Sequence, residues 1–508
     1  VNLILTSAVI FASLYFILIS LFHRNILHPF SEENFGIHNI AQQGSNITER
    51  MEPPKYGDIN SIFSIFTLWI FALIFGKLVS LLYLPPLLGQ MIAGILFSNI
   101  SFFHQFLLID KEWETFLRQT AFIWILIRAS FGLKHHILKK NLFTCASLGF
   151  LTTLIEVITI AVVSGLLFGL PAYVGLAFGF VLASTSPAVT VPVMIKLQNE
   201  DRGTTKGVPT VILASATLDN LFCITCFYIL MATFKAKIDD SLLLIIIKII
   251  VESILATIVG GIFGLFLWLI PSKNIGFYHF SRFITAILLS LGFYYITYSH
   301  DLLIAGPLIV CIICVLASFH WKRDNHHGTG KEEHALHISW VLFFQPLLFA
   351  FIGVFFDFSV FTWRLLFDAL TILGIGILIR ILAVFLFVLC SHFNYKEKLF
   401  SSICFIPKAT VQAALAPPLT FFVLSNMETK QYANLVLQTC ILSILITAPI
   451  GELLILFLGR TVLKRTHVIS DISSTVPPPS QLPLSNNVEA IPIETLQQHT
   501  YTKVDDVI

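Results

Sequence analysis

Long apolar stretches constrain this chain more than any other feature. They run for roughly 17 to 28 residues with few charges, long enough to cross the hydrocarbon core of a bilayer. A backbone inside lipid must satisfy its own hydrogen bonds, so each stretch is predicted to form an α-helix. The sequence therefore predicts an all-α polytopic membrane protein with about fourteen transmembrane helices. They are expected over residues 1–22, 61–82, 84–100, 116–133, 143–169, 171–194, 208–234, 241–270, 282–298, 302–320, 337–359, 364–391, 399–424 and 433–459.

The composition agrees with this class and argues against others. Hydrophobic residues make up 56% of the 508 residues and charged residues only 12%, far from the values of soluble domains. The net charge of +2 gives no general attraction to nucleic acid. The eight cysteines lie within or at the edges of apolar stretches, where neither a disulfide framework nor a zinc site is expected. No cofactor is predicted.

The distribution of Lys and Arg predicts the orientation. With an even number of helices both termini lie on one side, and the loops of that side hold about twice as many Lys and Arg as the opposite loops. Both termini are therefore expected in the cytoplasm, with the protein in the plasma membrane or an organelle membrane. Residues 1–60 are expected to form an N-terminal helix and an outward polar loop, residues 61–465 the transmembrane domain, and residues 466–508 a disordered cytoplasmic tail.

Asp219 lies in the middle of a long apolar stretch and is the strongest single pointer to function. A carboxylate at that depth costs about 2.5 to 3.5 kcal/mol on insertion scales, so it usually marks a group that carries or binds something. Further ionisable residues within apolar stretches are Glu156, Arg128, Arg380 and Lys408. Opposite charges at depth pair with one another or face a wet cavity. A salt bridge that only fixes packing is the alternative, and Arg128 can extend its side chain to a nearby cytoplasmic helix end.

Two apolar stretches contain groups that interrupt a helix. The first, 171–194, contains Ser184, Thr185, Pro187 and Pro192, and the second, 399–424, contains Pro407 directly before Lys408. Proline removes a backbone donor and frees a carbonyl, so both stretches are predicted to form discontinuous helices. Inverted-repeat transporters use such a pair, one in each half of the chain, to form a site at the bilayer midplane. Proline kinks without a ligand role are the alternative.

Motifs that follow one another between about residues 60 and 465 carry a family resemblance. In chain order they are Pro85-Pro86-Leu87-Leu88-Gly89, Leu126-Ile127-Arg128-Ala129-Ser130-Phe131-Gly132-Leu133, Ser186-Pro187-Ala188-Val189, Lys206-Gly207-Val208-Pro209-Thr210, Gln345-Pro346-Leu347-Leu348-Phe349, Ile379-Arg380-Ile381-Leu382, Pro407-Lys408-Ala409-Thr410-Val411-Gln412-Ala413-Ala414 and Leu445-Ile446-Thr447-Ala448-Pro449. Through them the chain resembles the animal NHA-type sodium/proton exchangers of the cation/proton antiporter superfamily.

The resemblance implies an inverted-repeat antiporter fold in which the two broken helices cross. It also implies a homodimer whose core domain carries the ion by an elevator-like motion while a dimerisation domain stays fixed. Asp219 matches the first acid of the family's paired carboxylates. Glu156 and Arg380 match an acid and a base that form a structural ion pair, and Lys408 matches a lysine that is a plausible charge partner for Asp219. Protons, monovalent cations and membrane lipid are the implied partners.

Asn220 is where the chain departs from that family. Close relatives have a second Asp at this place, and an amide oxygen can coordinate a cation but cannot exchange a proton. The resemblance implies exchange of Na⁺ or Li⁺ for H⁺ at Asp219, with Asn220, Thr185 and the freed carbonyls around Ser184 as further oxygen ligands. Proton coupling then rests on Asp219 alone or is lost, so a transport-impaired homologue with a regulatory or scaffold role is the alternative. No G-x-S-x-G motif or P-loop points to an enzyme.

Overall fold

A computed structural model describes residues 57–104, 109–132, 141–204, 206–235, 242–272, 277–324, 331–359 and 362–465. The predicted helix over 1–22, most of the predicted outward loop and the tail 466–508 lie outside these residues, so those parts stay predictions. Within the described ranges the chain is helical, with no strand and one isolated bridge between Arg202 and Arg465.

The all-α membrane prediction is confirmed, although the number of crossings is not. Ten helical segments in the described part of the chain are long and apolar enough to cross a membrane. The stretch expected over 84–100 forms a helix of only 14 residues, and the second half of the stretch 399–424 forms one of 16 residues. The helix expected over 116–133 begins earlier, at Lys111, and its first turn carries Glu112 and Glu114.

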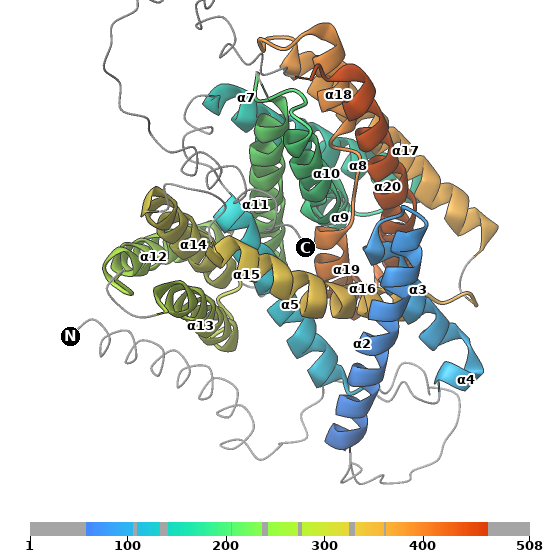
Figure 1. The fold of residues 1–508 in the computed structure, drawn as a ribbon. Coiled ribbons are helices and arrows are strands. Elements are labelled where there is room, and N and C mark those ends of the chain that lie inside the picture. The colour runs from blue at the N-terminus through green and yellow to red at the C-terminus, as the bar shows by residue number, and fades with distance from the viewer. Residues whose placement is uncertain are drawn as a thin grey trace, which may run out of the picture. The chain divides into compact units, whose positions relative to one another are not determined.

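The helices pack as two groups (Figure 1). In the flanking group, α12 packs on α14, α13 and α5 also pack on α14, and α3 packs on α2 and α16. This group comprises α2 (Gly57–Leu81), α3 (Pro86–Asn99), α4 (Ser101–His104), α5 (Lys111–Gly132), α12 (Leu242–Leu269), α13 (Tyr278–Ser299), α14 (Ala305–Asp324), α15 (Lys331–Ser339), the π-helical η2 (Trp340–Phe344) and α16 (Gln345–Val354).

In the crossing group, α8 packs on α9 and α17, α11 packs on η1 and α9, and α19 packs on α20. The group comprises α7 (Leu142–Ala146), the π-helical η1 (Ser147–Leu151), α8 (Thr152–Phe168), α9 (Ala172–Ala183), α10 (Pro187–Asn199), α11 (Val208–Lys235), α17 (Trp363–Val388), α18 (Tyr395–Ile403), α19 (Thr410–Ser425), η3 (Lys430–Tyr432) and α20 (Ala433–Val462). The two groups meet where α11 and α19 contact α5 and where α19 contacts α16.

The order of the elements repeats on the two sides of α12. Before it come α2, α3, α5, the continuous α7–α8, the broken α9–α10 and then α11. After it come α13, α14, the continuous α15–α16, α17, the broken α18–α19 and then α20. The broken helix therefore holds the fifth place in each set, as the inverted-repeat prediction requires.

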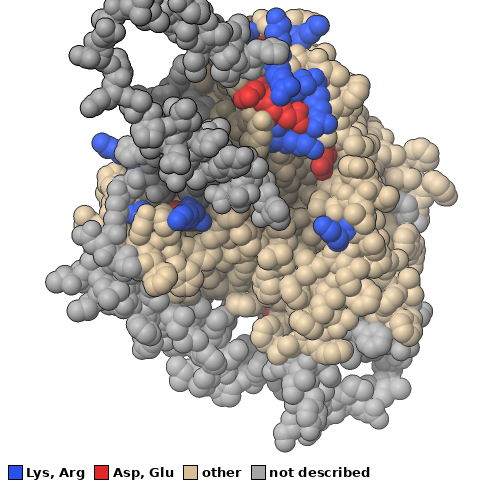
Figure 2. Space-filling view, in the orientation of Figure 1, with Lys and Arg blue, Asp and Glu red and all other residues tan. Residues whose placement is uncertain are grey.

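Burial separates the helices that face lipid from those inside. In the segment Ala172–Asn199, which contains the first broken helix, 78% of the most apolar 18-residue stretch is buried, whereas the corresponding share on α2 and on α12 is 22%. Most exposed positions of α12 are apolar, among them Ile254, Ile258 and Ile262, as expected for a helix against lipid or another apolar surface. Figure 2 shows a mostly uncharged face, with Lys, Arg, Asp and Glu gathered at the end where α18 lies.

Candidate ion-binding site

Two breaks in the helices lie at the centre of the crossing group. The first separates α9, which ends at Ala183, from α10, whose first residue is Pro187. The second runs from Cys404 to Ala409 between α18 and α19 and contains Pro407. Both helices are discontinuous, as the sequence predicted. Pro192, in contrast, lies inside α10 without ending it.

Side chains in and just after the second break bond the carbonyl oxygens that the first break leaves without a helical partner. The two N–H groups of Gln412 Nε2 are shared among the carbonyl oxygens of Val181 (2.8 Å), Leu182 (3.2 Å) and Ser184 (2.9 Å). Lys408 Nζ lies 2.6 Å from the carbonyl oxygen of Ala183. The sequence suggested that freed carbonyls around Ser184 would be open to a cation. The Ser184 carbonyl and the three before it instead hold the two broken helices together.

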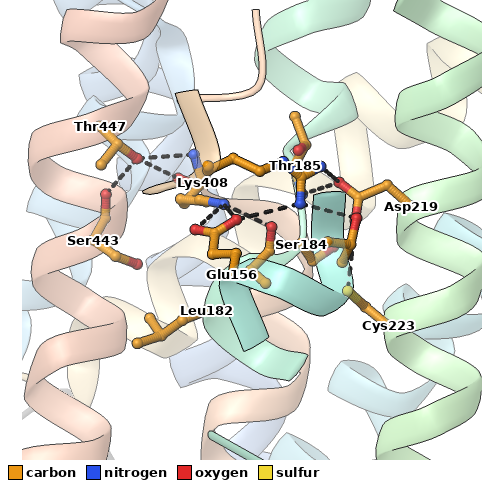
Figure 3. Close-up of polar contacts among 12 residues, drawn as sticks. Glu156, Leu182, Ser184, Thr185, Asp219, Cys223, Lys408, Ser443 and Thr447 are labelled. Carbon is orange, nitrogen blue, oxygen red and sulfur yellow. Dashed lines mark hydrogen bonds and ion pairs between the residues drawn. The ribbon is translucent and has the colours of Figure 1, made fainter. Parts of the chain in front are cut away.

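The backbones of the two breaks also bond directly, and α20 supports the second one. The N–H of Ser186 donates to the carbonyl oxygen of Pro407 at 2.7 Å. The Lys408 N–H donates to Thr447 Oγ1 on α20 at 2.8 Å (Figure 3). A Cβ on Gly451 would lie 2.5 Å from Pro407 Cγ, so α20 approaches the break closely only because residue 451 has no side chain.

Asp219 projects from α11 toward the first break and is fully buried (Figure 3). Its Oδ2 accepts hydrogen bonds from the Thr185 N–H at 3.0 Å and from Arg380 Nη2 at 3.2 Å. Its Oδ1 accepts from Thr153 Oγ1 at 2.8 Å and lies 3.5 Å from Cys223 Sγ. Such a set of donors lets a carboxylate remain charged in a site that excludes water.

Two acids and two bases form one buried cluster, which we call the charge quartet: Asp219, Glu156, Arg380 and Lys408. Arg380 bridges both acids, since its Nη1 lies 3.3 Å from Glu156 Oε2 while its Nη2 contacts Asp219. Lys408 Nζ lies 2.9 Å from Glu156 Oε1 and 3.0 Å from Oε2. The side chains are at most 2% exposed. With all four ionised, their charges cancel.

This pairing differs from the one expected for Lys408. The family resemblance made Lys408 a plausible partner for Asp219. In the structure, Lys408 forms its ion pair with Glu156, and Asp219 forms its ion pair with Arg380. The planar guanidinium can present parallel N–H groups to two carboxylates, whereas the ammonium is a point charge already held by Ala183. Glu156 and Arg380 are in contact, as expected, and a purely structural role for them stays a prediction.

The remaining predicted ligands lie beside Asp219. Ser184 Oγ donates to Asn220 Oδ1. Thr185 Oγ1 and Asn220 Nδ2 are buried and have no hydrogen-bond partner among the described residues. The Thr185 hydroxyl is thus an oxygen open to a ligand, whereas the Asn220 oxygen already uses one of its two lone pairs for Ser184. Arg128 lies outside the quartet, with its guanidinium 5.5 Å from the Trp340 ring centroid.

Sequence reasoning missed Thr153, Cys223 and Gln412 as site residues, although helical spacing could have found the first two. Thr153 precedes Glu156 by three residues in α8, and Cys223 follows Asp219 by four in α11. Residues three or four apart share one face of a helix, so each stands on the same face as a predicted site residue. Polar residues at those offsets were the available signal. Gln412 lies in the first turn of α19, whereas Lys408 precedes that helix, so no helical spacing relates the two.

Comparison with known proteins gives concordant matches. A family profile described as "Sodium/hydrogen exchanger, transmembrane" matches residues 66–456. Sodium/hydrogen exchanger 9B2 of Homo sapiens is 34% identical over 417 residues, covering 80% of this chain and 76% of the relative. Sodium/hydrogen exchanger 9B1 of Homo sapiens is 30% identical over 428 residues, covering 81% and 80%.

Among solved structures, the sodium proton antiporter MjNhaP1 from Methanocaldococcus jannaschii at pH 8 superposes with a TM-score of 0.65. The superposition covers 80% of this chain and 99% of that one at 17% sequence identity. At that identity the match supports the fold alone.

Proposed function

The chain belongs to the sodium/hydrogen exchanger family, and we propose that it exchanges Na⁺ or Li⁺ for H⁺ with Asp219 as the carrier group. The observation that carries the proposal is the fully buried Asp219 carboxylate beside two crossing breaks. A buried carboxylate is retained at a cost in a membrane protein and marks an ion or proton pathway. Broken helices are the usual setting of a transporter's binding site.

The chemistry needs one site that holds either a proton or a cation. Hard monovalent cations take oxygen ligands, and Asp219, the Thr185 hydroxyl and the Asn220 amide oxygen offer them together. For a cation to bind, Arg380 must yield its place on Asp219 Oδ2. Its other hydrogen bonds, to Glu156 and Thr153, would hold the guanidinium in the site after it leaves Asp219.

The charge count of the quartet favours a one-for-one exchange. The quartet is neutral when all four groups are ionised, and Asn220 adds no titratable group. A proton on Asp219 and a monovalent cation on Asp219 therefore leave the site with the same net charge. Exchange is then one proton for one cation and moves no net charge across the membrane.

The two helix groups fit an elevator-like alternating-access cycle. Every charge of the quartet comes from the crossing group, so that group can carry the ion as a unit. Its contacts with the flanking group include those of α11 and α19 with α5 and of α19 with α16, and sliding along these contacts would open the site to each side in turn. The flanking group would stay fixed, in a homodimer with both termini cytoplasmic.

A second candidate function is favoured by how completely Asp219 is occupied. Both of its oxygens already accept hydrogen bonds, and Arg380 sits where a cation would. Asn220 adds no second negative charge that would help a bound cation displace the Arg380 guanidinium. Such a site fits a transport-impaired homologue with a regulatory or scaffold role.

Flux measurements on the native chain and on Asn220→Asp separate the two. Each protein is reconstituted in vesicles containing a pH indicator, a pH step is imposed, and proton flux is recorded on adding Na⁺ or Li⁺ across the pH range. Cation-driven proton flux by the native chain supports the exchanger. A silent native chain that Asn220→Asp activates supports the impaired homologue, and silence in both proteins contradicts transport at this site.

A further inference from the structure

A cavity of about 600 Å³ lies at one end of the crossing group, where α7 and α11 begin and α17 ends. Its volume falls within the range of ligand pockets, roughly 300 to 1,000 Å³. Three stretches form its wall: residues 141–144, the loop before α11 with the first turn of that helix, and residues 390–393. Asp219 lies two turns further along α11 than Val211, the last residue of that helix in the wall. The cavity is therefore separate from the candidate ion-binding site.

The wall of this cavity is polar and basic. It contains the Lys206 ammonium, the His392 imidazole and the hydroxyls of Thr144, Thr210 and Ser391. No Asp or Glu stands among the described residues of the wall. An ammonium beside neutral hydrogen-bonding groups, with no carboxylate facing the same space, favours an anionic ligand.

Lys206 is held in position by a carboxylate outside the wall. Its Nζ lies 3.0 Å from Glu397 Oε2, which also accepts from the Asn394 N–H at 2.7 Å in the capping box of α18. The Glu397 side chain is 8% exposed and the Lys206 side chain 33%. An ammonium has three N–H donors, so Lys206 keeps donors for a ligand while the buried carboxylate fixes its place.

The end of α17 also faces the cavity, and its last carbonyls carry partial negative charge that would repel an anion. A second lysine offsets this charge, because Lys398 Nζ donates to the Leu389 carbonyl oxygen at 2.9 Å. The end of α17 therefore does not exclude an anion from the space beside it.

Exposed apolar side chains lead from the middle of the helices to this cavity. Leu142 and Phe143 belong to its wall and are 57% and 74% exposed. On α17 the exposed leucines Leu382, Leu386 and Leu389 follow one another at spacings of four and three, so they share one face that runs toward the cavity. An apolar face that ends at a basic group suits a phospholipid, whose chains lie in the hydrocarbon core and whose phosphate lies at the interface.

We propose that this cavity binds the phosphate group of an anionic ligand, with Lys206 as its charged contact. The apolar approach favours a membrane phospholipid as the source of that phosphate, and a water-soluble phosphate is the other source. A bound phosphate would touch α7, α11 and α17 together and so stabilise their packing. The inference goes beyond the proposed function, because binding at this cavity does not depend on transport.

Cys390 makes occupancy of the cavity measurable. It belongs to the wall and is the exposed cysteine among the eight of the chain. The full chain is purified in an uncharged maltoside detergent, and the rate at which N-ethylmaleimide labels Cys390 is followed by peptide mapping at fixed pH and ionic strength. The added probes are phosphatidylglycerol, diacylglycerol with the same acyl chains, and inorganic phosphate.

Phosphatidylglycerol at ten times its dissociation constant should slow labelling about tenfold, because the thiol then reacts only while the cavity is empty. Diacylglycerol should not slow it. Lys206→Gln should weaken the apparent affinity about tenfold through the loss of a charge-assisted hydrogen bond, and Lys206→Arg should keep it. Lys196→Gln, which changes an exposed lysine outside the wall, is the control and should leave the affinity unchanged.

Glu397→Gln separates binding from a structural role of the ion pair. It breaks the same ion pair as Lys206→Gln but leaves the ammonium in place, and a glutamine can still complete the capping box. The affinity should therefore be kept or raised in Glu397→Gln. Cys404 is fully buried and should stay unlabelled in every folded variant.

Protection by phosphatidylglycerol alone assigns the phosphate to a lipid, and equal protection by inorganic phosphate assigns it to a water-soluble ligand. Protection by neither overturns the proposal, as does equal protection by diacylglycerol. Equal losses of affinity in Lys206→Gln and Glu397→Gln overturn it too, because the ion pair and not the ammonium would then support the cavity. If Lys206→Gln exposes Cys404, Glu397→Gln decides alone, since a weaker affinity in that variant contradicts the proposal.

Discussion

Replacing Glu156 tests how the quartet is held together. Glu156 is 1% exposed and is the shared partner of both bases, with Lys408 Nζ at 2.9 Å and Arg380 Nη1 at 3.3 Å. Glu156→Gln leaves a net positive charge in the membrane interior, and Lys408 keeps only neutral acceptors, the Ala183 carbonyl and the introduced amide oxygen. Breaking one side of a buried ion pair costs about 3 to 5 kcal/mol. Lys408→Met leaves a net negative charge and should cost a similar amount.

The double variant Glu156→Gln, Lys408→Met restores neutrality and keeps the pair of Asp219 with Arg380. Its free energy of unfolding should therefore lie above that of either single variant, with a coupling energy of roughly 3 kcal/mol or more in the double-mutant cycle. Reversible unfolding in mixed micelles measures all four proteins. Losses that simply add would refute the direct pair. A cycle on Glu156 with Arg380 should give a smaller coupling, because removing Arg380 also deprives Asp219 of its partner.

Three further outcomes follow from other parts of the structure. Exchange by the native chain should not respond to an imposed membrane potential, because the neutral quartet predicts one proton per cation; a flux that scales with potential contradicts this. Gln412→Leu removes the donor shared by the carbonyls at the end of α9, and should lower the free energy of unfolding by about 1 to 3 kcal/mol in the same micelle assay. Lys196→Gln, which changes an exposed side chain, is the control and should change the free energy of unfolding little. Hydrogen bonds from Arg460 hold the pKa of the Glu200 carboxyl below its usual range. The ion pair of Glu200 with Arg460, which ties the end of α10 to the end of α20, is therefore intact at neutral pH and is lost as the pH falls through that lowered pKa. The nearby Gly203 N–H, which donates to the Lys464 carbonyl oxygen, should then lose its protection from hydrogen exchange, whereas Glu200→Gln should leave it unprotected at every pH.

Much of the fold was predictable because a membrane imposes strict rules. Apolar length gave the helices, and prolines beside polar residues located both breaks, at Pro187 and Pro407. Pro192 shows the limit of that rule. It lies one turn inside α10, where the residues before it are already helical, and the helix continues through it. Helix ends were also less certain, as the early start of α5 at Lys111 shows.

The members of the site were predictable, but their pairing was not. Depth in the membrane singled out Asp219, Glu156, Arg380 and Lys408, and all four meet in one cluster. Which acid holds which base depends on distances of a few tenths of an ångström between helices far apart in sequence. Spacing along one helix cannot supply such distances.

Thr153 was missed for a different reason. A threonine in an apolar helix usually bonds the carbonyl four residues earlier, and Thr152 does only that. Nothing in the sequence distinguishes the two neighbours except the spacing to Glu156. The difference arises because Gly149 lets α8 approach α11 at Asp219.

The central claim is that Asp219 carries the exchange, and Asp219→Asn tests it most directly. Native and variant proteins are reconstituted at equal density, and uptake of radioactive Na⁺ driven by an outward proton gradient is measured, with melting of the purified proteins as the control for folding. The account predicts uptake by the native chain and none above empty vesicles by a folded Asp219→Asn protein. Undiminished uptake by that folded variant would contradict it.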